Sequence, residues 1–169
     1  MNKKVIKELL WYVLIIVVVL LFRTFLYSPI VVRETSMNPT LYDGEVIILN
    51  KIGYKTNGIK RFDIIVFNYD GERLIKRVIG MPGDYVEYKD NKLYINGEYV
   101  EEDYTREETE DFILEVLGYS VIPEGKYLVM GDNRPVSKDS RIIGLIDESN
   151  ILGYTNTVIY PFSDFGEVE

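Results

Sequence analysis

The hydrophobic positions of this 169-residue chain follow two patterns, and the first is an unbroken apolar run. Residues 9–22 read LLWYVLIIVVVLLF, and the apolar character continues to Tyr27 if Arg23 is included. As a helix, the run to Tyr27 would measure about 28 Å, close to the ~30 Å hydrocarbon core of a bilayer. Arg23 lies near the helix end, where it can reach the lipid headgroups. The pattern predicts an N-terminal transmembrane helix.

A cleavable signal peptide is the alternative interpretation of this run. No small-x-small cleavage site follows it, which favours an uncleaved anchor. Three lysines precede the run, whereas only Arg23 and Arg33 follow shortly after it. This bias predicts a single-pass protein of the plasma membrane with a cytoplasmic N-terminus. We therefore expect an anchor over residues 1–27 and an extracytoplasmic domain over residues 28–169.

The second pattern is short, β-rich and interrupted by turns. Segments rich in Ile and Val predict strands at residues 30–34, 45–51, 63–69, 73–80, 126–132 and 151–160. Residues 84–100 alternate between apolar and polar side chains, with turn signals at Asp90-Asn91 and Asn96-Gly97, and predict a meander. Residues 101–118 differ: the acidic first half predicts a solvated loop, and residues 107–117 predict a short helix. The fold class expected is a mostly β, antiparallel domain behind one transmembrane helix.

Composition narrows the chemistry. The net charge is −8, and residues 1–27 carry more basic than acidic groups, so the excess of acidic residues lies in residues 28–169. An acidic domain repels phosphate backbones, which disfavours nucleic-acid binding. The chain has no cysteine and no histidine, which excludes disulfides, thiolate catalysis and the usual zinc ligands.

Ser36, in ETSMNPT, raises the question of which base would take its proton if it were a nucleophile. Without histidine, lysine is the known alternative partner of serine. A lysine must be desolvated to be neutral near pH 7, so a lysine that serves as the base should lie on an apolar strand. In RLIKRVIG, alternation places Lys76 on one side with Leu74 and Val78, and Arg77 on the other. From these residues alone, an ordinary charged residue guarding an edge strand is the commoner interpretation of Lys76.

Three segments together resemble bacterial type I signal peptidases. They are SMNPTL at 36–41, KRVIGMPGD at 76–84 and GDNRPVSKDSR at 131–141; RFDIIVF at 61–67 and the anchor add to the likeness. The resemblance runs from the anchor to about residue 160 and implies the signal-peptidase β fold. It also implies a membrane-bound serine endopeptidase that removes signal peptides from secretory preproteins, as a monomer, without metal or other cofactor.

The resemblance also implies roles for individual residues. Ser36 would be the nucleophile, Lys76 the general base and Ser137 the hydroxyl that hydrogen-bonds to the lysine and orients it. Met37 would lie toward the membrane surface. The remaining roles are structural: a carboxylate between two guanidiniums would brace the loop that carries Ser137. Those residues are Asp139, Arg77 and Arg141.

The chain departs from the family pattern at three positions. Glu34 stands where glycine or serine is usual, two residues before the nucleophile, and we expect its side chain to point away from the oxyanion. The Ser36 N–H and the Thr35 hydroxyl would then be the oxyanion donors. Phe62 replaces a common glycine, and Ile143 replaces a frequent aromatic residue.

Two other functions stay open at this point. An inactive membrane-anchored β module of the same fold is favoured only by Glu34. A Ser/Lys self-cleaving protease of the repressor type should carry a DNA-binding helix pair and a basic patch, whereas this chain has an anchor and an acidic domain.

Overall fold

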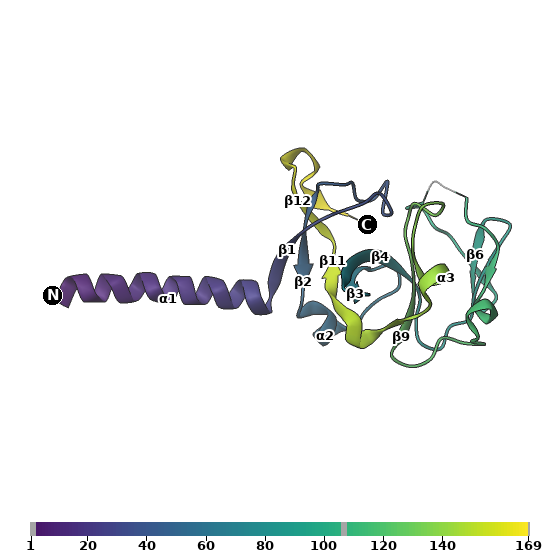
Figure 1. Cartoon of the computed structure of the whole chain (residues 1–169), viewed down its shortest axis with the longest axis horizontal. Coiled ribbons are helices and arrows are strands. Elements are labelled where there is room, and N and C mark those ends of the chain that lie inside the picture. The colour runs from purple at the N-terminus through teal and green to yellow at the C-terminus, as the bar shows by residue number, and fades with distance from the viewer. Residues whose placement is uncertain (1–2, 106–107, 169) are drawn as a thin grey trace.

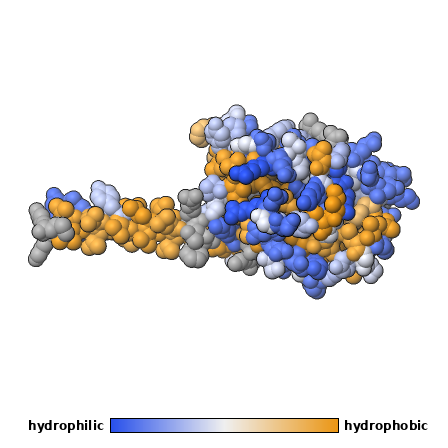
Figure 2. All heavy atoms as spheres, viewed as in Figure 1, coloured by the Kyte–Doolittle hydropathy of each residue, from blue (hydrophilic) through white to orange (hydrophobic). Residues whose placement is uncertain are grey.

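The chain forms a long N-terminal helix followed by a β-rich domain, in a computed structural model that describes residues 3–105 and 108–168 (Figure 1). Helix α1 (Lys3–Phe25) extends away from the domain. Its side chains at positions 9–21 are apolar and exposed, and Figure 2 shows the apolar surface along the helix. Among the described residues, we find no helix whose length and hydropathy together are sufficient for crossing a membrane. The side chain of Arg23 lies outside the described part of the chain.

The larger sheet contains nine antiparallel strands within the described residues. Eight of them follow one another in this spatial order: β10 (Ile146–Asp147), β9 (Lys126–Met130), β4 (Glu72–Gly80), β3 (Ile64–Tyr69), β11 (Ile151–Thr155), β2 (Val46–Asn50), β12 (Thr157–Tyr160) and β13 (Gly166–Glu167). The ninth, β1 (Tyr27–Val31), follows α1 and pairs with β2. The strand that carries Lys76, β4, therefore lies inside the sheet between β3 and β9.

The smaller sheet has four strands among the described residues and lies at the far end of the domain from α1 (Figure 1). Its spatial order is β7 (Glu98–Val100), β6 (Lys92–Ile95), β5 (Val86–Lys89) and β8 (Phe112–Ile113). Short helical segments complete the chain: α2 (Gly53–Asn57), α3 (Ser140–Ile143) and the 3₁₀ turns η1 (Leu114–Leu117), η2 (Glu148–Asn150) and η3 (Phe162–Asp164).

Two apolar clusters hold the segments that matter for the site. Met37 and Leu41, in the loop after β1, pack into one cluster with Ile47, Ile64 and Val66, all of them buried. Burial of one such side chain contributes about 1.5–3 kcal/mol, which fixes the loop against the larger sheet. A second cluster joins strands β4 and β9 to the smaller sheet, so the two sheets share a core.

Most of the predicted strands are confirmed, and the hairpin turns have the expected backbone. Asp90, Asn91, Asn96 and Gly97 all have positive φ, as two-residue hairpin loops of this kind require. The segment predicted as one strand at 151–160 is two strands, β11 and β12. Asn156 belongs to neither strand, and the pairing of β11 with β3 is irregular between Ile151 and Gly153.

The helix predicted over residues 107–117 is wrong for its described part. Residues 108–111 are irregular, residues 112–113 pair with β5 as strand β8, and only η1 is helical, as one 3₁₀ turn. Residue 107 lies outside the described residues. Phe112 and Leu114 are buried against the smaller sheet, so tertiary packing overrides the local helical pattern.

Candidate active site

Ser36 lies in the turn that follows β1, and three backbone contacts hold that turn. The Asn38 N–H donates to the Thr35 carbonyl, and the Leu41 N–H donates to the Met37 carbonyl. The Ser36 carbonyl accepts from the Asn133 N–H at 3.0 Å, which ties this turn to the loop after β9. Only 7% of Ser36 is exposed, so the hydroxyl is held inside the domain.

Lys76 reaches Ser36 from the middle of β4. Its Nζ donates to the Ser36 Oγ at 2.7 Å and to the Ile75 carbonyl at 3.0 Å. The residue is 1% exposed and pairs across the strands with Ile65, which is also buried. Burial lowers the pKa of Lys76, while the carboxylates of Asp139, Glu34 and Asp132 act in the opposite direction. The amine is thus in a setting that favours its neutral form.

The alternation that predicted Lys76 on an apolar face is only part of the cause of its burial. Every residue from 74 to 80 is buried, so β4 is covered on both faces, and Arg77 is as inaccessible as Lys76. The interpretation of Lys76 as a solvated charge on an edge strand is wrong, because the residue is 1% exposed and pairs with Ile65 of β3, although the pairing of β4 with β9 begins only at Arg77.

Ser137 lies beside the pair, but its hydrogen bond differs from the expected one. Its Oγ accepts from the Gly131 N–H at 3.1 Å. Within the described residues, the lysine amine makes its hydrogen bonds to Ser36 and Ile75, and the predicted bond to Ser137 is not formed. A Cβ on Gly131 would lie 2.3 Å from the Ser137 Oγ and 2.4 Å from the Ser36 carbonyl oxygen. The two serines therefore converge on Gly131, where no side chain fits.

The predicted bracing network is two ion pairs rather than one carboxylate between two arginines. Asp139 binds Arg141 at 2.8 Å, and its other partner is the Gly131 N–H. Arg77 binds Asp132 at 2.8 Å, with both side chains almost fully buried. The register of the strands explains this choice. Arg77 lies opposite Met130, the last residue of β9, and Asp132 follows two residues later, within reach of the guanidinium.

Asp132 and the acidic segment after β7 have structural roles that were not predicted from the sequence. Glu102 is buried there and accepts hydrogen bonds from the Tyr88 and Tyr104 hydroxyls and from Arg134. The Tyr104 ring covers the Arg77 guanidinium at 4.0 Å. This part of the segment is a packed strap over the two arginines, not a solvated loop. The sequence signal for Asp132 was its position as the last residue of the strand predicted at 126–132, which in the structure ends at Met130.

Both residues that replace a common glycine have left-handed backbone. Glu34 has φ 77° and Phe62 has φ 71°. Glycine adopts this conformation without the steric cost that a Cβ brings, so the glycine preference has a backbone cause. Phe62 contacts Tyr104 with its ring, at 5.4 Å between centroids. Ile143 ends α3 and packs against a buried cluster.

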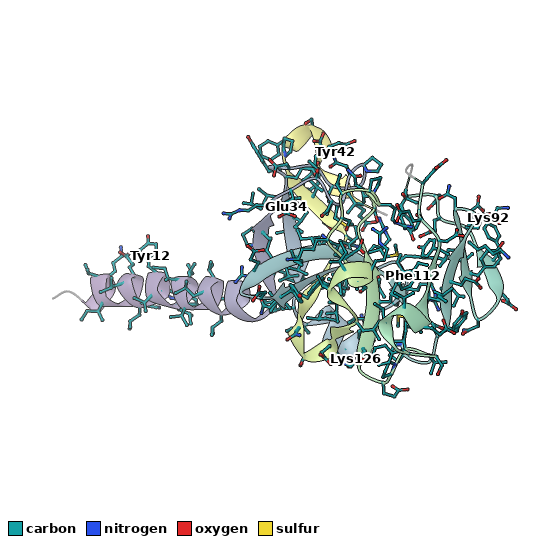
Figure 3. The ribbon with its side chains drawn as sticks, turned by 45° about the vertical axis from the view of Figure 1, so that its right-hand side comes forward. Tyr12, Glu34, Tyr42, Lys92, Phe112 and Lys126 are labelled. Atoms are coloured by element: carbon teal, nitrogen blue, oxygen red, sulfur yellow. The ribbon has the colours of Figure 1, made fainter. Side chains whose placement is uncertain are left out.

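A cleft of about 660 Å³ opens in front of the Ser36–Lys76 pair. Its walls are residues 29–34 with 36–37 on one side and residues 71–76 on the other. Glu34, labelled in Figure 3, belongs to the first wall and is exposed. A serine hydroxyl bonded to a buried lysine at the base of a cleft is the arrangement of serine hydrolases that use lysine in place of histidine.

Comparisons with known proteins agree with this class. The family model for signal peptidase, peptidase S26, matches residues 5–160. Signal peptidase IB of Staphylococcus aureus (strain COL) is 39% identical over 180 residues, covering 98% of this chain and 94% of that protein. Signal peptidase I of Bacillus licheniformis is 40% identical over 168 residues, covering 93% and 89%.

A solved structure gives the same result for the fold. The crystal structure of a signal peptidase I from Enterococcus faecalis V583 is 44% identical, with a TM-score of 0.54, and covers 57% of this chain and 95% of that chain. The chain belongs to the signal peptidase family, peptidase S26, and is a serine endopeptidase. The family resemblance and the mostly β fold expected from the sequence are confirmed.

Proposed function

We propose that Ser36 is the nucleophile and Lys76 the general base of this endopeptidase. The observation that carries the proposal is the 2.7 Å hydrogen bond between the Lys76 Nζ and the Ser36 Oγ inside a buried site. Burial lowers the pKa of Lys76, and a neutral amine is what a base for a serine hydroxyl must be. In the reactive form the hydrogen bond reverses, and the Ser36 O–H donates to the nitrogen lone pair.

Cleavage then follows the acyl-transfer sequence. The Ser36 Oγ attacks the scissile carbonyl carbon as its proton passes to Lys76, which becomes an ammonium. The ammonium gives this proton to the leaving amine as the peptide bond breaks. A water molecule, deprotonated by the same neutral amine, hydrolyses the ester on Ser36 and restores both groups.

The surrounding groups serve the tetrahedral intermediate and the geometry of the base. The Ser36 N–H and the Thr35 hydroxyl are the proposed donors to the oxyanion, and each such donor contributes about 3 kcal/mol to transition-state stability. Ser137 is the proposed orienting hydroxyl, and to bind it the amine would exchange its bond to the Ile75 carbonyl for one to the Ser137 Oγ. The proposed supports of this loop are Asp139, Arg141 and Arg77.

The substrates are signal peptides of exported preproteins, in keeping with the family of the chain. The cleft suits an extended peptide, because strand edges form both walls. Within the described residues, β1 pairs only with β2, and residues 72–76 of β4 pair only with β3. A substrate strand can therefore add its backbone hydrogen bonds to either edge and present its carbonyl to Ser36.

A membrane anchor is the proposed role of α1, with residues 1–27 as the anchor and residues 28–169 as the extracytoplasmic domain of a monomer. The support is the apolar run at 9–22 and the exposure of the side chains at 9–21, which form an apolar surface along the helix (Figure 2). A helix that is apolar all round is stable only in an apolar environment. The basic residues before the run favour a cytoplasmic N-terminus in the plasma membrane. Sharing the bilayer with the substrate would hold the scissile bond at the depth of the cleft.

Trapping the acyl-enzyme tests the function. The full chain in detergent micelles is mixed with a preprotein for a few milliseconds, quenched with acid and analysed by mass spectrometry. We expect an ester adduct on Ser36 with the mass of the signal peptide, and no adduct with the Ser36→Ala variant. Cleavage without any adduct on Ser36 would contradict the assignment, and absence of cleavage at every pH would favour the inactive module.

The dependence of cleavage on pH should have an alkaline-rising limb. Only neutral Lys76 can accept the proton, and below its pKa the neutral fraction falls about tenfold for each pH unit. Because burial lowers that pKa from the ordinary value of lysine, the limb should end below the pH at which a solvent-exposed lysine titrates. Initial rates of preprotein cleavage between pH 5 and 11 measure it. A rate that rises only around the pKa of a carboxylate, near ~4, would identify a different base.

A further inference from the structure

Glu34 occupies a backbone position that is unfavourable for it. It has φ 77°, a conformation that costs an L-residue roughly 1 kcal/mol and glycine almost nothing. Its N–H donates to the Asp43 carboxylate at 2.9 Å, which helps to hold the turn. Its own carboxylate makes no hydrogen bond or ion pair within the described residues. Nothing in the packing therefore explains a glutamate here.

The place of Glu34 relative to the catalytic pair suggests what its charge does. Glu34, Ser36 and Lys76 line the same cleft, and Glu34 lies on the wall formed by the end of β1 (Figure 3). Glu34 is exposed, so its side chain lies at the surface of this wall. The buried amine therefore shares this cleft with an acidic side chain.

The other charged groups around Lys76 occur mostly in opposite pairs. From the loop after β9 and from α3 come the ion pairs of Asp132 with Arg77 and of Asp139 with Arg141. The two walls of the cleft carry adjacent residues of opposite sign, which are Arg33 with Glu34 and Glu72 with Arg73. Glu34 differs from Asp132 and Asp139 because, within the described residues, no guanidinium binds it.

We propose that Glu34 is an electrostatic tuning residue of this enzyme: its carboxylate favours the ammonium form of Lys76 and opposes the oxyanion of the transition state, and so holds back cleavage near neutral pH. The proposal rests on the proposed function of Lys76 as the base. It predicts that a neutral residue at position 34 gives a faster enzyme.

The charge of Glu34 sets the direction in which the pKa of Lys76 changes when this carboxylate is removed. Burial lowers the pKa of Lys76, and the carboxylate of Glu34 is among the groups that act against burial. Removing this carboxylate lowers the pKa further and increases the neutral fraction at any pH on the rising limb. The limb therefore moves to lower pH.

Three variants separate charge from backbone strain. Glu34→Gln removes the charge and keeps the strain, whereas Glu34→Gly removes both. Glu98→Gln is the matched control, because it changes the net charge equally at an exposed position of β7, in the smaller sheet. Initial rates of preprotein cleavage by the full chain in detergent micelles are measured from pH 5 to 11, at about 0.05 M and 1 M salt.

We expect Glu34→Gln and Glu34→Gly to cleave about threefold faster than the wild type on the rising limb at low salt, with the limb shifted to lower pH. The difference should shrink at 1 M salt, where the Debye length is about 3 Å, because Glu34 is exposed. Glu98→Gln should follow the wild-type profile. In a Ser36→Ala background, which cannot turn over, Glu34→Gln should lower the pH at which the labelled Lys76 amine titrates by NMR.

A Glu34→Gln profile that superimposes on the wild type would overturn the proposal. So would a gain confined to Glu34→Gly, because that result assigns the effect to the backbone. Failure of the proposed function has a different signature, which is cleavage by Ser36→Ala or an absence of the Ser36 adduct. If Ser36 is acylated and Glu34→Gln leaves the NMR titration of Lys76 unchanged, the tuning role alone is wrong.

Discussion

Replacement of Lys76 by methionine is expected to lower the rate of preprotein cleavage by about 10⁴-fold or more while the domain stays folded. Methionine fills a volume similar to that of the lysine stem, and its side chain suits a site that is 1% exposed. The change removes an amine whose burial opposes its charge, so the temperature of unfolding should be unchanged or higher. Only the proton acceptor of Ser36 is lost.

Lys76→Arg is the matched variant for this test. It keeps a cationic donor at the position, but a guanidinium does not deprotonate in proteins. If Lys76 acted only by binding or by its positive charge, Lys76→Arg would keep much of the activity, and this result would contradict a role as base. The expected result is that both variants, like Ser36→Ala, cleave at the background rate in a single-turnover assay, with circular dichroism spectra that match the wild type.

The strands were predictable because local signals and tertiary structure agree there. The Asn96-Gly97 turn favours its hairpin through the positive φ that both residues adopt, and the Ile- and Val-rich segments have high β propensity. The helix predicted over residues 107–117 failed because Phe112 and Leu114 gain more by packing against the smaller sheet than by local helix formation. Sequence periodicity describes only the segment itself, whereas burial depends on what covers it.

The same distinction applies to the candidate site. Family motifs were sufficient to select Ser36 and Lys76, which the structure brings within 2.7 Å. Alternation could not show that both faces of β4 are buried, which is the cause of the lowered pKa of Lys76. The partner of Arg77 depends on the register between β4 and β9, which no local pattern encodes. The buried Glu102, Tyr104 and Arg134 contacts join segments about 30 residues apart, so composition alone made the acidic strap resemble a solvated loop.

Loss of the Asp132 carboxylate is expected to have the largest effect on stability. Asp132→Asn keeps the size of the side chain but removes the carboxylate that pairs with the Arg77 guanidinium, which is 2% exposed. Breaking one partner of a buried ion pair costs about 3–5 kcal/mol, because the remaining charge stays desolvated. Arg77 also donates to the Phe62 carbonyl, and the Tyr104 ring covers it, so it has no short path to solvent. Urea unfolding of the full chain in detergent micelles, followed by far-ultraviolet circular dichroism, measures the loss of unfolding free energy.

The ion pair between Lys126 and Asp147 is the matched control for this prediction. It is slightly shorter, at 2.6 Å against 2.8 Å for Arg77 and Asp132, but its side chains are 28% and 52% exposed. Asp147→Asn should therefore cost less than about 1 kcal/mol, the usual limit for a solvated pair. The double variant Asp132→Asn with Arg77→Met should be more stable than the sum of the two single changes predicts, because it removes the buried Arg77 charge together with the Asp132 carboxylate. Equal losses for Asp132→Asn and Asp147→Asn would show that burial does not set the strength of the Arg77 pair, and the account of this loop as a rigid support for the site would fail with it.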